Sequence, residues 1–551
     1  MKSKFGLPCM IFSILIWGIS LYQTHLDIDE SLNNFGLLST LPPLFFLSIF
    51  FMLVALIILN ETSKRFLINI LIVLMIFTTV YIVGGHGAIQ NIGVPLRHFG
   101  TISSIGENGQ LDITLNYAFN WPSAMILFSS ILQVCGIKAD SAVSVITVVY
   151  VFLLILYFLP LLLILTNNRM SKVDQVPISI MLFFFLFWVP QHYISPQGVV
   201  YYSYILMLYC FMKVFAEKKI TPQLILITII LMAFIITSHL LTSLTVLMIL
   251  LALILVGKHW ERITLLILGS VIFLGWTVYA NVTFLNNYYV NKLFSKLFRI
   301  DQLLLQTSMA TPGSSVGGVM QHVYFQIIVA LLLITLTVSA LIVIRKKAWN
   351  QPIKSVCLMV LTIIAGFVIM GPMYGIYGYS GEMLQREYIL LLPLCIVLIN
   401  NALIKSITYQ RFVMFSLFLI MPLFMLCKFG NLSCYVSPGH LSGNKFIVSS
   451  AERGTIIQDT RYSGGVYKNK NNLKDAFLSN TYKNRQSDHL LKYSVDLPGN
   501  HNYIFVSEHA RRWYLFLYND SDVIPELQNE LKLYRASDIY ASGDFRISYL
   551  D

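Results

Sequence analysis

The sequence predicts an α-helical polytopic membrane protein of about 13 transmembrane helices, followed by a small C-terminal extracytoplasmic α/β domain. Three observations lead to this fold class. Apolar residues make up 56% of the 551 residues and charged residues 12%, and the mean hydropathy of +0.71 lies far above that of a soluble globular chain. Apolar runs long enough to cross a bilayer recur along most of the chain. The last part instead carries short apolar runs between Gly, Asn, Ser and Lys clusters, a pattern typical of strands.

The spans are predicted from length, because a hydrocarbon core of about 30 Å needs about 20 apolar residues per helix. Backbone groups that lipid cannot satisfy require these spans to be helical. The segments that qualify lie near residues 6–23, 42–59, 66–83, 141–166, 176–191, 198–215, 222–238, 241–256, 262–280, 322–344, 354–371, 387–401 and 411–427. A further apolar stretch at 122–135 is shorter and is flanked by Pro and Gly, so it is not counted as a span.

The orientation follows from Lys and Arg, which are enriched in cytoplasmic loops. They fall in every second connection, for example at Lys64, Arg169 and Arg345. The amino terminus is therefore predicted to be cytoplasmic, and a transmembrane domain at 1–427 has outer loops at 84–121 and 281–321. The net charge of +12 is then mostly a topology signal, so no nucleic-acid partner is expected. No small-residue cleavage site follows the first apolar run, which is interpreted as an anchor rather than a signal peptide.

The tail at 428–551 is predicted to be the extracytoplasmic α/β domain. Its alternating apolar runs at 445–449, 454–459, 501–507 and 543–549 indicate strands, with weaker helical stretches near 473–480 and 523–532. It carries no phosphate loop, nucleophile elbow or zinc spacing. Covering the outer face and binding substrate directly are both open roles. Cys427 and Cys434 either form a disulfide in the oxidising exterior or stay apart, with Cys427 inside the membrane.

The first polar outer segment holds Arg97, His98, Glu107 and Asp112. A guanidinium forks onto phosphate oxygens and an imidazole donates or shuttles a proton, while either carboxylate suits a general base. The alternative is an interfacial loop whose aromatic side chains anchor in the headgroup region. These aromatic residues are Tyr117 and Trp121.

Three further polar segments lie at predicted outer connections. Ser195 and Gln197 at a helix amino terminus suit an anion, although a plain hairpin turn also fits. His239 stands between two strongly apolar runs, where an ionisable residue is a site candidate or simply reaches water. Glu382 and Arg386 are four residues apart, which fits a helix-end ion pair or a ligand clamp. All four segments fall on one side of the membrane, which indicates a common outer cavity.

Several of these segments, taken in order, resemble those of prokaryotic membrane proteins of the glycosyltransferase C (GT-C) superfamily. The resemblance covers most of the chain and rests on Arg97 to Gly100, Gly109 to Asp112, the box from Tyr117 to Pro122, Ser195 to Gly198, Ser238 to Thr242, and a closing strand from Ile539 to Ile547. It implies a GT-C-like fold and transfer of a sugar from a polyprenyl-phosphate carrier at the outer face, with an acidic residue in an outer loop as the base.

The chain departs from the superfamily pattern in two ways. The acidic pair usually found after the first span is represented by Asp27, Asp29 and Glu30, while the richer polar segment follows the third span. The box often written Trp-Pro-Gly ends in Ser123, and no Pro follows the His-x-x-Thr step. The catalytic base is therefore left open among Asp112, Glu107, Asp29 and Glu30.

The leading hypothesis is a membrane glycosyltransferase that moves a lipid-linked sugar to an envelope glycan, lipid or protein acceptor. Arg97, His98 and Arg386 are the expected phosphate contacts, and no metal or cofactor is called for beyond the lipid-linked donor. A transporter or flippase of lipid-linked glycans is the alternative, although intramembrane charges are scarce and the polar segments share one side. A non-catalytic scaffold for envelope assembly is the third possibility.

Overall fold

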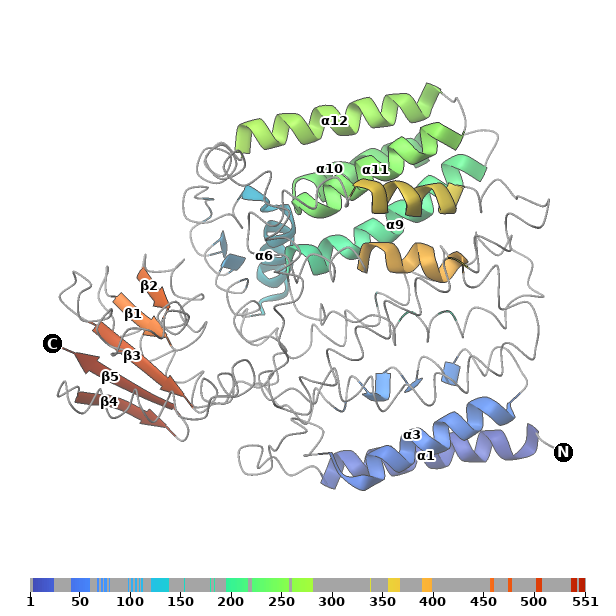
Figure 1. Cartoon of the computed structure of the whole chain (residues 1–551). Coiled ribbons are helices and arrows are strands. Elements are labelled where there is room, and N and C mark those ends of the chain that lie inside the picture. The colour runs from blue at the N-terminus through green and yellow to red at the C-terminus, as the bar shows by residue number, and fades with distance from the viewer. Residues whose placement is uncertain are drawn as a thin grey trace.

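A computed structural model gives the arrangement of the chain (Figure 1). The residues that it describes are 3–23, 41–59, 67–68, 71–72, 74–76, 79, 98, 101–102, 105–106, 109, 111, 120–137, 153, 179, 183, 195–216, 221–256, 260–280, 337, 355–366, 389–398, 456–459, 474–477, 502–507, 537–542 and 545–550.

Two helices near the amino terminus pack side by side. Helix α1 is Ser3–Gln23 and α3 is Pro43–Ile58. The Ser13 hydroxyl donates a hydrogen bond of 2.6 Å to the Ser48 carbonyl, and the rings of Phe12 and Phe51 meet edge to face. A serine hydroxyl can join two helices inside an apolar core. It can do so because a carbonyl that already accepts its own helix bond has a second lone pair.

The central helices form a bundle around one apolar core. They are α6 (Ser123–Cys135), α9 (Pro196–Ala216), α10 (Pro222–Ile236), α11 (Leu240–Val256) and α12 (Trp260–Ala280), and residues 355–366 and 389–398 are also helical. Helix α10 packs on α9 and α12, and α11 packs on α12 (Figure 1). The connections between α10, α11 and α12 are so short that each of these helices must run antiparallel to the next.

Helix ends follow the local sequence. Thr221 caps α10 by accepting a hydrogen bond from the Leu224 amide, with Pro222 in the first turn where no N–H is needed. Helix α6 ends at Gly136, whose left-handed φ of 65° allows the Ile137 amide to donate to the Leu132 carbonyl. The 13 residues of α6 match the expectation that the stretch at 122–135 is too short to count as a span.

The helices fit a membrane protein. In the described part of the chain, two are long and apolar enough to cross a bilayer, Phe5–Gln23 and Arg262–Ala280. Both expose large apolar side chains, such as Leu15 and Val271, as expected where a helix faces lipid instead of water. Seven of the predicted spans coincide with the described helices α1, α3, α9, α10, α11 and α12 and the helix at 389–398, and the helix at 355–366 lies within an eighth.

Other predictions fall on residues outside the described ranges. These include nearly all of the spans at 141–166, 176–191, 322–344 and 411–427, the loop at 281–321, and both Cys427 and Cys434. The count of about 13 spans and the division into 1–427 and 428–551 therefore stay predictions.

The carboxyl-terminal part contains a five-stranded mixed sheet, drawn apart from the helices in Figure 1. Its strands are β1 (Ile456–Asp459), β2 (Lys474–Phe477), β3 (Asn502–Ser507), β4 (Ser537–Ser542) and β5 (Phe545–Leu550). The order is β2-β1-β3-β5-β4, in which β1 is parallel to β2 and β3 while β5 is antiparallel to β3 and β4.

The sheet corrects two details of the sequence interpretation. Residues 474–477 form strand β2, so the expected helical stretch near 473–480 is wrong. The closing strand expected over 539–547 is a hairpin, because Ser542 of β4 pairs with Phe545 of β5. The strands expected at 454–459, 501–507 and 543–549 are present as β1, β3 and β5.

Candidate functional site

A polar turn joins α10 to α11 at one end of the bundle. Its hydroxyls bond to backbone carbonyls near the helix ends. Thr237 Oγ1 donates to the Ala233 carbonyl at 2.9 Å, Ser238 Oγ to the Phe234 carbonyl at 2.6 Å, and Ser243 Oγ to the His239 carbonyl at 2.7 Å. The Ser238 bond gives the Phe234 carbonyl a partner in the last turn of α10, where a helix leaves its carbonyls without an amide of its own. The other two carbonyls also accept backbone amides, those of Thr237 and Ser243.

His239 caps the start of α11. Its Nδ1 accepts a hydrogen bond of 3.3 Å from the Thr242 amide and lies 2.9 Å from Thr242 Oγ1. Because Nδ1 is the acceptor, the proton of the neutral ring is on Nε2. The side chain is half-buried. The cap therefore fixes the orientation of the ring at the start of α11.

The Trp-Pro box docks against this turn. The Ser123 hydroxyl donates to Thr237 Oγ1 at 2.8 Å, and the Ser123 amide donates to the Thr237 carbonyl at 3.4 Å. From α12, Trp276 Nε1 donates to the Asn120 carbonyl at 3.0 Å. Trp121 is only 6% exposed, so it packs inside the protein and is not a headgroup anchor.

Asn120 is the residue in this box that sequence reasoning did not select. It is 2% exposed, and among the described residues its buried side-chain Oδ1 has no hydrogen-bond partner. A buried acceptor left unpaired costs about 1–3 kcal/mol, a cost that a ligand hydroxyl or amide removes. The available signal was its polarity directly before a buried Trp-Pro pair.

The first polar segment packs on α6. Residues 98, 101, 102, 105 and 106 are helical, and Gly109, at φ 63°, donates its amide to the Ile105 carbonyl at 2.9 Å. The Ser129 hydroxyl donates to the Ile102 carbonyl at 3.1 Å, and Gln133 Nε2 donates to the Gly106 carbonyl at 2.8 Å. His98 is buried, at 4% exposure. Gly109 is thus in the left-handed conformation of a helix C-cap, and Asp112 lies three residues further along the sequence.

The Ser-Pro-Gln-Gly segment starts α9. The Ser195 Oγ accepts a hydrogen bond of 2.9 Å from the Gly198 amide, which is the geometry of an N-cap. Ser195 and Gln197 are both buried, at 4% exposure. The Ser195 oxygen therefore accepts a hydrogen bond within the first turn of α9. An anion could interact with Ser195 only through the hydroxyl proton.

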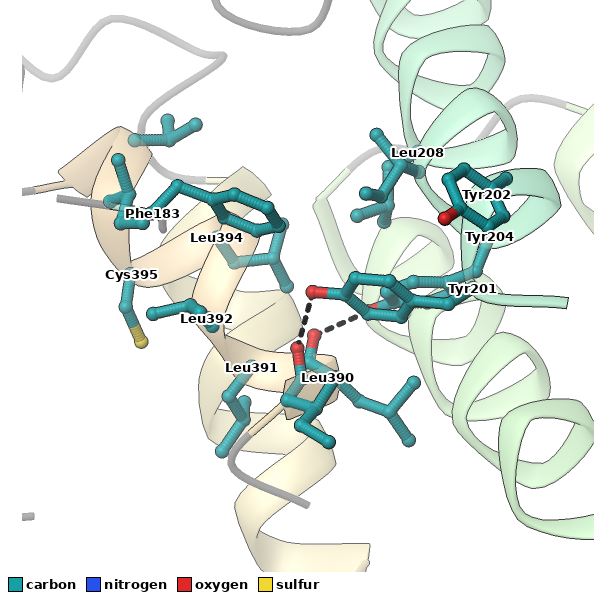
Figure 2. Close-up of a cluster of buried hydrophobic side chains, with 14 of the residues drawn as sticks. Phe183, Tyr201, Tyr202, Tyr204, Leu208, Leu390, Leu391, Leu392, Leu394 and Cys395 are labelled. Atoms are coloured by element: carbon teal, nitrogen blue, oxygen red, sulfur yellow. Dashed lines mark hydrogen bonds between the residues drawn. The ribbon is translucent and has the colours of Figure 1, made fainter. Parts of the chain in front are cut away.

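Helix α9 is tied to the helix at 389–398 by two tyrosines (Figure 2). Tyr201 donates its hydroxyl to the Ile389 carbonyl and Tyr204 to the Leu390 carbonyl, both at 2.8 Å. The two tyrosine rings are stacked. The bonds hold the start of that helix against α9, and the polar segment with Glu382 and Arg386 immediately precedes it in the sequence.

Five of the thirteen site residues expected from the sequence have a described position: His98, Trp121, Ser195, Gln197 and His239. All but the half-buried His239 are buried. The structure connects the segments of His98, Trp121 and His239 through α6 and the α10–α11 turn. The other candidates lie outside the described residues: Asp29, Glu30, Arg97, Glu107, Asp112, Tyr117, Glu382 and Arg386. Within the described ranges, no group of three His, Cys, Asp or Glu side chains is placed to hold a metal ion.

No protein-family model matches the sequence, and no curated protein matches it. Solved structures do. The apo crystal structure of ArnT from Cupriavidus metallidurans aligns with a TM-score of 0.51 at 10% identity, over 89% of this chain and 98% of ArnT. ArnT from the same organism bound to undecaprenyl phosphate gives 0.48 at 10% identity, over 88% and 97%.

The archaeal oligosaccharyltransferase AglB from Archaeoglobus fulgidus, in complex with an inhibitory peptide and a dolichol-phosphate, gives a TM-score of 0.49 at 9% identity, over 84% of this chain and 72% of AglB. Apo ArnT is matched along nearly its whole length, with a TM-score above 0.5. The chain therefore has the fold of ArnT, and its resemblance to the GT-C superfamily is confirmed as a resemblance of fold.

Proposed function

We propose that this protein is a membrane glycosyltransferase that transfers a sugar from a polyprenyl-phosphate-linked donor to an envelope glycan, lipid or protein acceptor at the outer face. One observation carries the proposal. Hydrogen bonds join the segment at 98–109, the box at 120–123 and the turn at 237–239 around α6. The ArnT fold and the sequence resemblance support the choice of chemistry.

This cluster has the parts that recognition of a sugar phosphate requires. Asn120 contributes a buried carbonyl oxygen that accepts no hydrogen bond, which suits a sugar hydroxyl because a hydroxyl can donate. His239, whose ring is held by Thr242, contributes an imidazole side chain. A donor aimed at departing phosphate oxygens stabilises the charge that develops there.

The transfer needs a base at the acceptor and cations at the leaving group. A carboxylate takes the proton of the acceptor hydroxyl as its oxygen bonds to the anomeric carbon, and the polyprenyl phosphate leaves with the electron pair of the broken bond. We assign the base to Asp112, Glu107, Asp29 or Glu30. Arg97, His98 and Arg386 are the proposed phosphate contacts, with Tyr117, Trp121, Ser195, Gln197 and Glu382 lining the donor site.

We propose that the protein is multi-pass, with a cytoplasmic amino terminus and an extracytoplasmic carboxyl-terminal domain. The positions of Lys and Arg in alternating connections support this orientation. It places the base, the phosphate contacts and the acceptor on the same side of the membrane.

The test is sugar transfer in membranes supplied with a radiolabelled polyprenyl-phosphate sugar pool. Alanine at Arg97, His98 or Asp112 is expected to lower transfer at least about 100-fold, the usual contribution of a general acid–base group. Thr264→Ala is the control, because Thr264 is exposed on α12 and its hydroxyl donates to the Trp260 carbonyl of the same helix. Wild-type transfer by the three alanine variants overturns these assignments.

A further inference from the structure

We infer that α6 is an in-plane membrane helix, whose exposed apolar face inserts among lipids at the level of the headgroups beside the α10–α11 turn. In Figure 1, α6 lies at one end of the bundle and runs crosswise to α9, α10, α11 and α12. Its 13 residues measure about 20 Å at the rise of an α-helix, too short for a hydrocarbon core of about 30 Å. A helix with this length and direction follows the membrane surface and does not cross the bilayer.

Two hydrogen bonds fix the level at which α6 begins. The Ser123 hydroxyl is bonded to Thr237, which directly follows the last residue of α10. The Asn120 carbonyl accepts a hydrogen bond from Trp276, four residues before the end of α12. Both helices coincide with predicted spans, so these two ends mark one boundary of the hydrocarbon core. Helix α6 therefore starts at that boundary.

One side of α6 is covered by protein. The helix packs on α9, and its buried residues are Ala124, Met125, Ser129 and Leu132. Polar side chains next to this side bond to the segment that carries His98, where Ser129 donates to the Ile102 carbonyl and Gln133 to the Gly106 carbonyl. The hydrogen-bonding groups of these two side chains are thus directed to the protein.

The opposite side of α6 is apolar and exposed. Leu127, Ile131 and Val134 are 42%, 46% and 88% exposed. Their spacing of four and three residues places them on one face of the helix. Ser130 is the hydroxyl residue among them, and the sequence of α6 contains no Asp, Glu, Lys or Arg. This face therefore offers apolar area and no charge.

Lipid is the occupant that fits this face. A surface helix in water turns its polar residues outward, whereas α6 bonds Ser129 and Gln133 to the protein and exposes its aliphatic side chains. The carboxyl-terminal sheet does not cover the face, since these side chains stay exposed in the complete chain. Helix α12, which is bonded to the start of α6, exposes an apolar stripe of its own that includes Ile267 and Leu274. The apolar face of an in-plane helix reaches about 5–10 Å into the boundary between headgroups and acyl chains.

Insertion of α6 also sets the depth of the candidate site. The helix is bonded to the segment of His98 along its length and to the turn of His239 at its start. Because α6 lies in the plane of the membrane, both segments are held at the level of the lipid headgroups.

The test measures depth in the full-length protein in phosphatidylcholine nanodiscs. A fluorescent amino acid is incorporated in place of Leu127 or of Val134, two exposed positions seven residues apart. Lipids brominated near the headgroup or near the end of the acyl chain quench the fluorescence according to depth. Both positions are expected to be quenched more strongly by the bromines near the headgroup, at depths equal within about 3 Å, half a helical pitch. Ile131 is a third position on the same face and is expected at the same depth.

Ile267 and Leu274 of α12 are the matched control pair, because they too are exposed, apolar and seven residues apart. In a helix that crosses the membrane their depths are expected to differ by about 10 Å. The inference is overturned if neither brominated lipid quenches the α6 positions, or if the depths of Leu127 and Val134 differ as much as those of the α12 pair. The measurement needs no lipid-linked sugar, so its result does not depend on the proposed transfer activity.

Discussion

The hydroxyl of Ser123 donates a hydrogen bond of 2.8 Å to the hydroxyl of Thr237, across 114 residues of sequence. The Thr237 hydroxyl in turn donates a hydrogen bond of 2.9 Å to the Ala233 carbonyl. The chain of bonds runs from the start of α6 into the last turn of α10, two residues before His239. It links the Trp-Pro box to the turn that carries His239.

Removing this link is expected to loosen the cluster. Thr237→Val keeps the shape and leaves the Ser123 hydroxyl without its acceptor. The expected loss is about 1 kcal/mol of unfolding free energy, seen as a lower midpoint in thermal unfolding of the detergent-solubilised protein. Thr264→Ala is the control and is expected to keep the wild-type midpoint. Equal midpoints for Thr237→Val and wild type contradict a structural role for the bond.

Asn120 is expected to separate stability from activity. Asn120→Leu replaces a buried, unpaired carbonyl oxygen with an apolar group of similar size, so the ligand-free protein is expected to be as stable as wild type or more stable. Sugar transfer is expected to fall at least about tenfold, because one hydrogen bond in the substrate complex is lost. A variant that is destabilised and fully active contradicts the binding role of Asn120.

Thr242 is expected to act through the orientation of His239. In Thr242→Val the hydroxyl beside Nδ1 is lost, while the backbone amide still donates a hydrogen bond to the ring. We expect kcat to fall about three- to tenfold with KM nearly unchanged, since about one hydrogen bond of positioning is removed. In a His239→Ala background the same change is expected to have no further effect. An equal fall in both backgrounds indicates that Thr242 acts independently of His239.

The tyrosine pair of Figure 2 is expected to contribute to stability. Tyr201→Phe and Tyr204→Phe each remove a hydroxyl that donates to a helix carbonyl. The expected loss is about 1 kcal/mol each, with coupling in the double variant because the two rings are stacked. Tyr22→Phe on α1 is the control, since Tyr22 is 83% exposed. Thermal midpoints that match Tyr22→Phe contradict the proposed clamp.

The sequence was sufficient for the elements whose signal is local. Apolar length predicted the helices at 198–215 and 262–280. Short length and flanking Pro and Gly kept the apolar stretch at 122–135 out of the predicted spans, and the structure has the 13-residue α6 there. The same reasoning failed at Lys474–Phe477, because this four-residue strand has little β-propensity and is defined by its pairing with β1.

The cluster was predictable in its parts and not in its connections. The polar segments of His98, Trp121 and His239 are visible in the sequence as exceptions in an apolar chain. Hydrogen bonds of Ser129, Gln133 and Thr237 connect these segments. They depend on the packing of helices that are distant in the sequence, and this packing cannot be predicted from the local pattern of one sequence. Asn120 was missed because its significance lies in burial without a partner, a property of the folded state.

The most direct test of the proposed transfer uses the purified protein in proteoliposomes with a radiolabelled polyprenyl-phosphate sugar and a pool of envelope acceptors. We expect label to leave the lipid and appear on the acceptor, and the combined variant of Asn120→Leu with His239→Ala to abolish this transfer. Label that stays on the lipid while changing leaflet contradicts glycosyl transfer and supports a flippase.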